Sequence, residues 1–378
     1  MLIGVPKEIK NNEYRVGMTP AGVRELISHG HRVLVQTGAG SGVGLADIHY
    51  TEVGAEVVDL ADEVFGQAEL IVKVKEPQPQ ELRILRPGQV LFAYLHLAPD
   101  PEQTSRLIAS DCVAIAYETV TASGGGLPLL APMSEVAGRM SIQAGATCLE
   151  KSHGGAGVLL GGVPGVAPGR VVIFGAGVVG CNSARMAVGL GADVTVLDRS
   201  LERLAYLDSL FGNRIRTILS TAAAIEEHAL TADLVVGAVL VPGAATPKLL
   251  VRGHLAHMRP GSVLVDVSID QGGCFDTSRP TTHDQPTYII DDIVHYCVAN
   301  MPGAVARTST FALTNATLPF VLTLADKGYR QALLDDPNLR MGLNIHRGEV
   351  TCSPVATGLG YKFVEPLTSI RSVSADGK

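Results

Sequence analysis

The sequence lacks several features that mark common classes of protein. Its six cysteines are far apart and form no C-x-x-C pair, which argues against a metal knuckle and fits a reducing compartment. The 30 Lys and Arg residues are scattered without a run, and the formal net charge is −7, so nothing indicates binding to nucleic acid or to an anionic membrane surface. No apolar segment reaches the length of a membrane span without Gly, Pro or a charge interrupting it. The beginning of the sequence has no apolar signal-peptide core, so we expect a soluble, cytoplasmic protein.

Aromatic residues are also scarce, at 4%, whereas hydrophobic residues reach 46% and glycines number 42. A Val/Ile/Leu/Ala-rich interior is typical of parallel sheets covered by helices, and such folds use many glycines in their turns. The 378 residues are enough for two domains. We therefore predict an α/β protein with two doubly wound Rossmann-like domains, each built on a parallel sheet, joined by long helices.

Residues 170–198 carry the clearest motif. An apolar run predicts a strand, glycines follow at Gly175, Gly177 and Gly180, a helical pattern comes next, and a second strand ends on Asp198. In a G-x-G-x-x-G turn the first glycine allows the tight turn, the second lets the backbone approach a pyrophosphate, and the third lets the helix pack on the sheet. Asp198 can accept hydrogen bonds from a ribose 2′-hydroxyl, so the motif predicts NAD rather than NADP. The competing interpretation is a tight turn in a flavodoxin-like domain that binds no dinucleotide.

A second glycine cluster, at residues 38–44, does not satisfy the fingerprint, because Val43 stands where its third glycine should be. We predict a flexible connection there.

Charged side chains follow several of the strands predicted in the first third of the chain. Predicted strands end on Lys75, His96 and Glu118, and Arg15 lies in the loop after the first strand. Ligands of doubly wound sheets bind beyond the carboxyl ends of the strands. The sequence thus predicts a catalytic edge formed by these residues, with Glu118 in a supporting role.

Three of these side chains could bind a 2-amino acid or take part in its chemistry, and each also has a simpler structural interpretation. Arg15 can hold a carboxylate through two hydrogen bonds, or it can be one solvated charge among many. Lys75 can grip the carboxylate or polarise a carbonyl, although Lys73 shares its face of the strand. His96 has a side chain suited to proton transfer near neutral pH, or it can be an ordinary loop histidine.

A later predicted strand, at residues 263–267, runs towards Asp270. This carboxylate can orient groups or exchange protons beside a nicotinamide, or it can cap the turn before Gly272. Ser134 is predicted to cap a long helix, and Asn315 to begin another that ends at Gly328. Residues 341–375 are the least informative part.

Several segments at matching order and spacing resemble alanine dehydrogenase: MLIGVPKEIKNNEYRVGMTP, IVKVKEP, LHLAP, APMSEVAGRM and NMPGAVART. The related group also contains the NAD-binding subunit of proton-translocating transhydrogenase and saccharopine dehydrogenases. The resemblance implies reversible oxidative deamination of L-alanine to pyruvate and ammonia with NAD, in a homo-hexamer. It implies a substrate domain of residues 1–130 plus 305–378 and an NAD-binding domain of residues 131–304.

The resemblance also assigns site residues. It implies substrate binding by Arg15 and Lys75 and acid/base chemistry by His96 and Asp270. Some relatives carry a carboxylate and an imidazole as metal ligands where this chain has Thr323 and Lys327, so we expect no metal there. Besides the three glycines, the cofactor contacts that it implies are Ser134, Val178, Val179, Asp198, Arg203, Ser220, Val239, Leu240, Val267, Ser268, Ile269, Asp270, Arg279, Val298, Ala299, Asn300 and Met301.

Three other functions compete with this interpretation. A transhydrogenase-like NAD(H)-binding module would not need Arg15, Lys75 and His96 together. A saccharopine-type amino-acid dehydrogenase would take a larger substrate than the short chain favours. A catalytically silent NAD sensor would bind a partner and turn over no amino acid.

Overall fold

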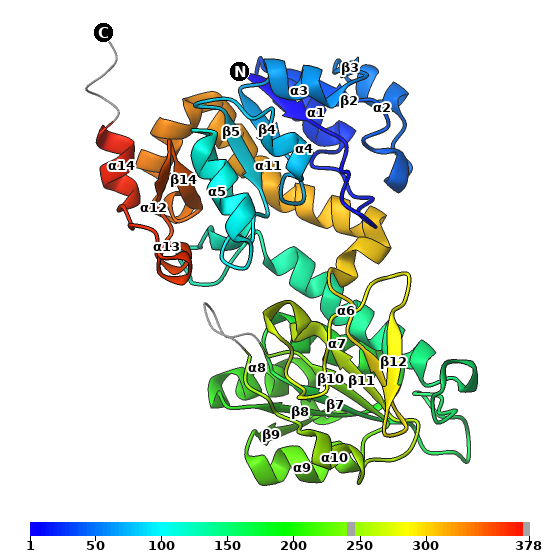
Figure 1. Ribbon diagram of the computed structural model, residues 1–378. Coiled ribbons are helices and arrows are strands. Elements are labelled where there is room, and N and C mark those ends of the chain that lie inside the picture. The colour runs from blue at the N-terminus through cyan, green and yellow to red at the C-terminus, as the bar shows by residue number, and fades with distance from the viewer. Residues whose placement is uncertain (240–245, 373–378) are drawn as a thin grey trace. The chain divides into compact units, whose positions relative to one another are not determined.

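The computed structural model describes residues 1–239 and 246–372. The chain divides into two compact units, the first formed by Met1–Met133 with Val305–Lys378 and the second by Ser134–Ala304. Each unit is a sheet covered by helices (Figure 1). The predicted Leu240 contact lies outside the described residues.

The sheet of the first unit combines parallel strands with an antiparallel edge. Its described strands are β1 (Leu2–Val5), β2 (Arg32–Gln36), β3 (Glu56–Val58), β4 (Leu70–Val72), β5 (Val90–Ala93), β6 (Val113–Ala116), β14 (Leu343–His346) and β15 (Glu349–Val350). They lie in the order β15-β14-β6-β5-β4-β1-β2-β3. All pairs from β6 to β3 are parallel. The order reverses between β1 and β4, and such a switch point is where doubly wound sheets bind ligands.

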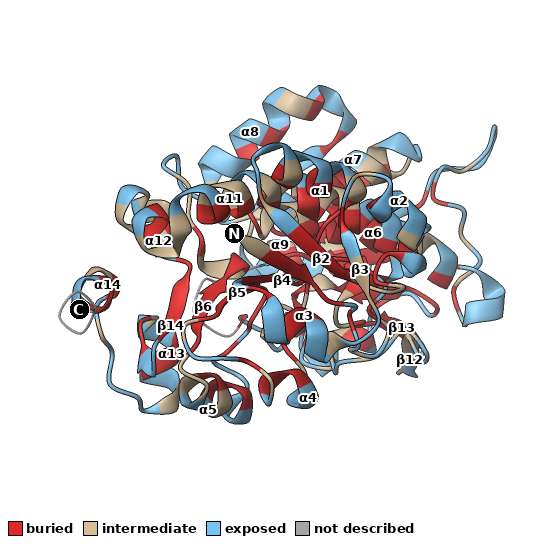
Figure 2. Cartoon of the chain, turned by 90° about the horizontal axis from the view of Figure 1, so that it is seen from above, coloured by how far each residue is buried: buried red, intermediate tan, exposed pale blue. Residues whose placement is uncertain are grey.

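Helices cover this sheet, and their ends follow from local sequence. Those described are α1 (Pro20–Ser28), η1 (Ser41–Val43), α2 (Asp47–Thr51), α3 (Ala61–Gln67), α4 (Pro79–Leu82), α5 (Pro101–Ala109), η2 (Tyr117–Thr119), α11 (Ala306–Asp335), α12 (Pro337–Arg340), α13 (Ser353–Leu359) and α14 (Pro366–Ser372). Thr19 caps α1, where its side chain accepts from the Gly22 N–H ahead of an N1 proline. Figure 2 shows the strands of this sheet mostly in red, and helices such as α5 with red and pale blue faces.

The uninformative residues after 341 extend this sheet. β14 pairs antiparallel with β6, with an irregularity between Leu343 and Ile345, and β15 pairs with β14. All four residues of β14 are buried. An antiparallel edge strand of this kind gives little sequence signal, because it is short and interrupted by a bulge.

The predicted start of a helix at Asn315 is wrong, because α11 begins at Ala306. Its first turns bury small polar residues, Ser309 and Thr310, instead of an apolar stripe, so the periodic signal there is weak. Gly328 interrupts the helix as expected, with φ 73° and ψ 148°.

The predicted flexible connection at residues 38–44 is also wrong. It contains the 3₁₀ turn η1, and Arg307 donates a 2.5 Å hydrogen bond to the Val43 carbonyl. A Cβ at Gly40 would lie 2.5 Å from the Leu45 carbonyl oxygen, and one at Gly42 would lie 2.8 Å from that of Tyr14. The glycines therefore serve close packing in this turn.

The second unit is built on a sheet in the order β12-β13-β11-β10-β7-β8-β9. Its described strands are β7 (Arg170–Phe174), β8 (Asp193–Asp198), β9 (Arg216–Leu219), β10 (Leu234–Gly237), β11 (Val263–Asp266), β12 (Thr287–Ile290) and β13 (Ile293–Tyr296). Only the β12–β13 pair among them is antiparallel. The order reverses between β7 and β10, which pair in parallel, so the switch point falls at the carboxyl end of β7.

Helices lie on both faces of this sheet. Those described are η3 (Lys151–His153), α7 (Val178–Gly189), α8 (Leu201–Phe211), η4 (Gly212–Arg214), α9 (Ala222–Leu230), α10 (Arg252–Leu255), η5 (Val267–Gln271) and η6 (Met301–Val305). In Figure 1, α7 and α8 lie on one face and α9 and α10 on the other. The core beneath the second pair includes Val172, Leu197 and Leu264.

The helix α6 (Ala131–Cys148) carries the chain from the first unit into the second. The predicted cap at Ser134 is wrong, because the helix begins three residues earlier. Pro132 is compatible with that start, since a proline in the first turn removes an N–H that has no helical partner.

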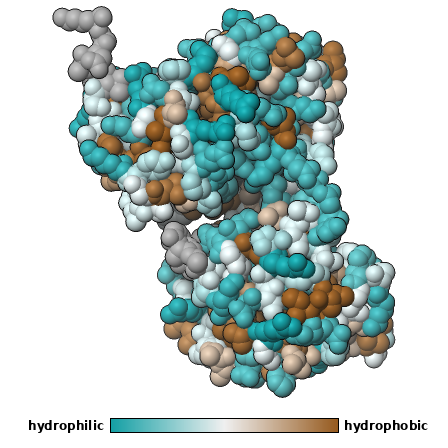
Figure 3. Space-filling model, viewed as in Figure 1, coloured by the Kyte–Doolittle hydropathy of each residue, from teal (hydrophilic) through white to brown (hydrophobic). Residues whose placement is uncertain are grey.

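Within the described residues, no helix is long and apolar enough to cross a membrane. On the face drawn in Figure 3, apolar side chains form separate patches on a mainly hydrophilic surface.

Candidate active site

Four neighbouring parallel strands of the first unit carry the predicted charged residues at one edge. Arg15 follows β1, Lys75 follows β4, His96 follows β5, and Glu118 lies in η2 directly after β6. Because β6, β5, β4 and β1 are adjacent in the sheet, these residues follow the same edge. Arg15 and Lys75 come from the two strands that flank the switch point.

Arg15 is a buried cation, with 2% of its surface exposed, so the interpretation as a solvated charge is wrong. Its Nε donates to Glu13 Oε1 at 2.6 Å and its Nη2 to Glu13 Oε2 at 2.5 Å. Its Nη1 points to the Met133 sulfur at 3.1 Å. The Glu13 carboxylate thus holds one side of the guanidinium in a bidentate pair.

Electrostatics place Lys75 near the same pair. Burial acts to raise the pKa of the Glu13 carboxyl, but the hydrogen bonds and charge of Arg15, together with the charge of Lys75, outweigh burial and lower it. Lys75 itself is half-buried. The charges of Arg15 and Lys75 thus both act on the Glu13 carboxylate, and, against the effect of burial, Lys75 also lowers the pKa of the neighbouring Glu76 carboxyl.

The structure separates Lys73 from Lys75. Lys73 is fully buried, and its Nζ lies 3.2 Å from Glu8 Oε2 and 2.7 Å from Glu81 Oε1. The other oxygen of Glu8 accepts from the N–H groups of Val74, at 2.7 Å, and Lys75, at 3.3 Å. Lys73 thus belongs to a buried ion network that holds the backbone of the segment carrying Lys75.

His96 has a left-handed backbone conformation, with φ 48°, which is uncommon for residues other than glycine. Glu118 Oε1 accepts from the His96 N–H at 2.6 Å and lies 3.9 Å from the imidazole Nδ1. The ring stacks on Tyr94 at a centroid distance of 5.9 Å, and the Tyr94 hydroxyl donates to the Leu129 carbonyl at 2.5 Å. The imidazole itself is exposed. Strained backbone of this kind is held in place by its surroundings and concentrates at functional sites.

Three neighbours of these residues, Glu13, Tyr94 and Met133, are not among the predicted site residues. Glu13 and Tyr94 each stand two residues before a predicted site residue, a spacing that places side chains on the same face of extended chain. Met133 contacts Arg15 from the start of α6, and no local signal in the sequence links the two.

In the second unit, the glycines meet the requirements of the dinucleotide fingerprint. Gly175 has φ 106°, and a Cβ there would lie 2.4 Å from the Ala238 carbonyl oxygen. A Cβ at Gly180 would lie 1.8 Å from the Gly175 carbonyl oxygen, so the helix could not pack this closely. At Gly177 the nearest atom to a Cβ would be an Arg203 nitrogen at 3.6 Å, so this glycine leaves open space beside the turn.

The helix that follows offers its N-terminus to a ligand. Gly177 is the N-cap of α7, and no described side chain caps that end, so its first N–H groups can meet a phosphate. Val178 is exposed there, Val179 is half-buried, and Gly180 is buried. These residues fit a bound dinucleotide on structural grounds.

Asp198 ends β8 and ties it to the glycine turn. Its Oδ2 accepts from the Ala176 N–H at 2.6 Å and its Oδ1 from the Ser200 N–H at 2.7 Å. A carboxylate has about four acceptor sites, so capacity remains for ribose hydroxyls. The Ser220 N–H donates to the Asp198 carbonyl, which places Ser220 at the same edge.

A cavity of about 430 Å³ adjoins the glycine turn. Its walls come from the glycine turn and from the helices α6, α7 and α8. They include Gly177, Val178, Arg139, Arg185 and Arg203, with Glu135 opposing the three cations. The cation-rich lining suits a ligand that carries phosphate.

The loops after β10 and β11 also reach this edge. Val239 follows β10, and its carbonyl accepts from the Ser268 hydroxyl at 2.7 Å. Val267, Ser268, Ile269 and Asp270 form η5, in which Ser268 and Ile269 are buried and Asp270 is exposed. The Asp270 carboxylate is thus accessible to solvent.

The remaining predicted cofactor contacts differ in burial and in the partners of their side chains. Arg279 stacks on Tyr288 at 4.3 Å. Val298 and Met301 are buried, whereas Ala299 is half-buried. Asn300 has φ 62°, and its carbonyl faces His283 Nε2 at 3.1 Å. Ser134 is half-buried in the first turns of α6.

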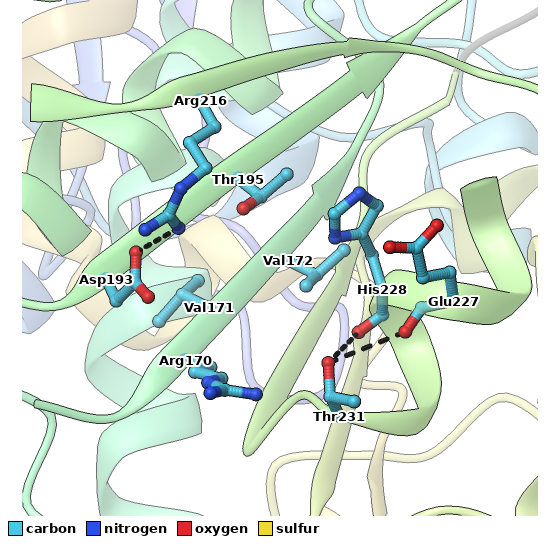
Figure 4. A pocket seen from close by; sticks show the side chains of 9 residues that line it. All are labelled: Arg170, Val171, Val172, Asp193, Thr195, Arg216, Glu227, His228 and Thr231. Carbon is cyan, nitrogen blue, oxygen red and sulfur yellow. Dashed lines mark hydrogen bonds and ion pairs between the residues drawn. The ribbon is translucent and has the colours of Figure 1, made fainter. Parts of the chain in front are cut away.

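A second cavity, of about 330 Å³, lies at the opposite edge of this sheet (Figure 4). Arg170, Asp193 and Arg216 line it from the amino ends of β7, β8 and β9, and Arg216 pairs with Asp193. None of the predicted cofactor residues lines this cavity, so the two hollows are distinct. In the described part of the chain, no group of three or more His, Cys, Asp and Glu residues could hold a metal ion.

The glycine turn, the uncapped helix and Asp198 define a dinucleotide-binding α/β protein, and the cationic edge of the other unit adds groups suited to a small acid. Residues 4–137 match the N-terminal domain, and residues 141–353 the C-terminal domain, of a family described as alanine dehydrogenase/PNT. The chain belongs to this family.

Relatives support the assignment along the whole chain. Alanine dehydrogenase of Halomonas elongata is 60% identical over 98% of this chain and 100% of its own length. That of Mycolicibacterium smegmatis is 56% identical over 97% and 98%. A solved L-alanine dehydrogenase matches with a TM-score of 0.92 and 51% identity, covering 95% of this chain and 99% of its own. A transhydrogenase from Sinorhizobium meliloti, at 24% identity and a TM-score of 0.80 over 93% and 99%, shares the fold.

Proposed function

We propose that this protein is an NAD-dependent L-alanine dehydrogenase, which converts L-alanine reversibly to pyruvate and ammonia. The observation that carries the proposal is the presence, in one chain of this family, of both a dinucleotide turn and a strand edge that carries Arg15, Lys75 and His96. A protein that only bound NAD would need the first feature and not the second.

The first unit supplies the groups for the amino acid in this proposal. Arg15 and Lys75 hold the carboxylate of alanine, because both cations act on the Glu13 carboxylate at this edge and Glu13 fixes the guanidinium in one orientation. Orienting the substrate in this way removes much of the entropic cost of reaching the reactive geometry.

The proton chemistry falls to His96 and Asp270. With the amine of alanine unprotonated, a bound nicotinamide would supply the acceptor for the Cα hydride, and the protonated imine of pyruvate would remain. His96 then takes a proton from water as its oxygen bonds to the imine carbon. It returns a proton to the nitrogen when the C–N bond breaks and ammonia leaves. Asp270 serves as a second group that exchanges protons, and Glu118 holds the backbone of His96 in place.

The second unit binds the cofactor in this proposal. The N–H groups at the start of α7 and the Arg203 side chain take the phosphates, and Asp198 takes the ribose hydroxyls. The same carboxylate disfavours a 2′-phosphate, so NAD is preferred over NADP.

Two wider features are part of the proposal. The resemblance to the family supports a homo-hexamer, which light scattering on the purified protein would test. The six cysteines are all unpaired thiols, which supports a reducing, cytoplasmic location.

The decisive experiment is absorbance at the NADH band with L-alanine and NAD at alkaline pH, repeated with NADP, L-serine and glycine. We expect a rise with alanine and NAD and little with NADP. NADH binding without turnover of any amino acid would overturn the proposal and favour a transhydrogenase-like module or a sensor.

A further inference from the structure

A buried carboxylate lies directly behind the loop that carries Asp270. Asp266 is the last residue of β11, and none of its surface is exposed. It precedes the turn η5, so it is separated from Asp270 by three residues. No function considered above uses it.

Five groups donate to the Asp266 carboxylate. Oδ1 accepts from the Ser268 N–H at 3.1 Å and contacts the Cys274 thiol at 3.6 Å. Oδ2 accepts from the N–H groups of Cys274, at 2.9 Å, and Phe275, at 3.3 Å, and from the Ser278 hydroxyl at 2.5 Å. Burial raises the pKa of this carboxyl, and the bonds from Ser278, Phe275 and Cys274 oppose that rise. An acceptor-only group in the middle of donors is the arrangement that an ionised carboxylate satisfies best.

Two glycines keep space open for this carboxylate. A Cβ at Gly273, whose φ is 73°, would lie 2.6 Å from Asp266 Oδ2. One at Gly237 would lie 3.2 Å from Asp266 Oδ1 and 2.2 Å from the Cys274 sulfur. The ends of β10 and β11 and the end of the loop after β11 therefore pack closely around the Asp266 side chain.

The bonds of Asp266 close the loop at both ends. The carboxylate accepts a hydrogen bond from Ser268 at the start of the loop and from residues within 274–278 at its end. Between them, the Gly273 N–H donates to the Ser268 carbonyl at 3.0 Å. The Ser268 hydroxyl also donates to the Val239 carbonyl, which links the loop after β11 to the loop after β10.

We propose that Asp266 is a positioning residue that fixes Asp270 and the neighbouring cofactor-binding backbone through this set of hydrogen bonds. The inference rests on the proposed function in assigning Asp270 a chemical role. Its effect on cofactor binding does not depend on which substrate is oxidised, since it acts through Ser268 and Val239.

The test is Asp266→Asn, measured at a temperature where the folded state dominates. The amide would turn an NH₂ donor towards groups that are all donors, so the loop must shift to avoid unpaired buried groups. We expect the NADH dissociation constant, measured by NADH fluorescence, to rise about tenfold and kcat to fall about tenfold or more. The KM for alanine should change little, because Arg15 and Lys75 belong to the first unit.

Asp276→Asn is the matched control. It makes the same chemical change in the same loop at an exposed side chain, and it should leave NADH affinity and kcat unchanged. If Asp266→Asn also leaves both unchanged, the inference is wrong, whatever happens to the melting temperature. A purely structural role would lower the melting temperature alone.

Ser278→Ala keeps the proposal testable if Asp266→Asn does not fold. It removes one donor from Oδ2 and should weaken NADH binding in the same direction by a smaller factor; an unchanged affinity would contradict the proposal. If the wild type binds NADH but oxidises no alanine, the proposed function fails and the NADH titrations still decide the role of Asp266.

Discussion

The two units carry their proposed ligand-binding groups at the carboxyl ends of parallel strands, but they hold these groups in place by different chemistry. In the first unit, charged side chains are held by other charged side chains, as Glu13 holds Arg15 and as Glu8 and Glu81 hold Lys73. In the second unit, glycines and backbone N–H groups form the surface, and Asp198 and Asp266 hold backbone from behind.

The difference matches the ligands that we propose. A small amino acid offers one carboxylate and one amine, so few groups must carry the recognition and each must be fixed. A dinucleotide offers phosphates and hydroxyls over a long surface, so a bare backbone turn can approach it closely. Side-chain charge networks should therefore govern the stability of the first unit, and backbone access should govern binding by the second.

The largest expected effect comes from breaking the buried ion network of the first unit. Lys73→Met leaves Glu8 and Glu81 as buried charges without their cation, which should cost about 3–5 kcal/mol of unfolding free energy. Urea unfolding measures this loss. Lys327→Met is the control, since it breaks a solvent-exposed pair with Asp335 and should barely move the midpoint. Equal midpoints for the two variants would refute the role given to the network.

Acid should destabilise the first unit through His346, the buried histidine of β14. Burial lowers its pKa to about 4, whereas an unfolded chain has an ordinary value of about 6.5. The folded protein therefore keeps its full stability above about pH 6.5, where His346 is neutral in both states. As the pH falls from 6.5 towards 4, the unfolded state binds the proton first, and the folded protein loses stability. The loss should approach about 3 kcal/mol.

The measurement compares urea midpoints at pH 7 and pH 4.5 for the wild type and His346→Gln. The variant should lose less stability on acidification, since it has no imidazole to protonate. The same acid loss in both proteins would rule out His346 as its source.

Removing the imidazole at the edge of the first sheet should affect chemistry and leave cofactor binding alone. His96→Ala should lower kcat about 10²-fold without changing NADH affinity. His96→Asn should do the same, and asparagine tolerates the left-handed backbone at this position, so strain is excluded as the cause. His153→Ala changes an exposed histidine and serves as the control. Unimpaired turnover in both His96 variants would remove this residue from the mechanism.

A smaller effect should separate backbone access from protein packing in the second unit. Gly177→Ala meets no protein atom closer than 3.6 Å, so stability should hold. Its methyl group would stand where the pyrophosphate approaches, and NADH binding should weaken about tenfold. Gly189→Ala changes another glycine of α7, with nothing within 4 Å of the new methyl group, and should leave binding intact. Tight NADH binding by Gly177→Ala would argue against this turn as the phosphate site.

Much of the fold and part of the edge chemistry could be predicted from short-range patterns. The apolar strands with glycines and polar residues after them placed Lys75, His96 and Glu118 at strand ends, because parallel strands of similar length finish at one edge. Hydrophobic periodicity did not predict the elements in which the buried residues form no continuous apolar stripe. The first turns of α11 hide Ser309 and Thr310, and β14 is a short strand with a bulge.

The sequence alone determined what is local in this protein: the glycine spacing, the strand that precedes it, the acid that ends the next strand and the alternation of strands with helices. These depend on contacts between residues near one another in the chain. Which charges are buried and paired depends instead on how distant segments of the chain pack together. The burial of Arg15, the separation of Lys73 from Lys75, and the position of Asp266 behind the loop of Asp270 are examples. Each depends on which strands become neighbours. The free energy of a charge depends on its surroundings in three dimensions, and a linear pattern does not contain them.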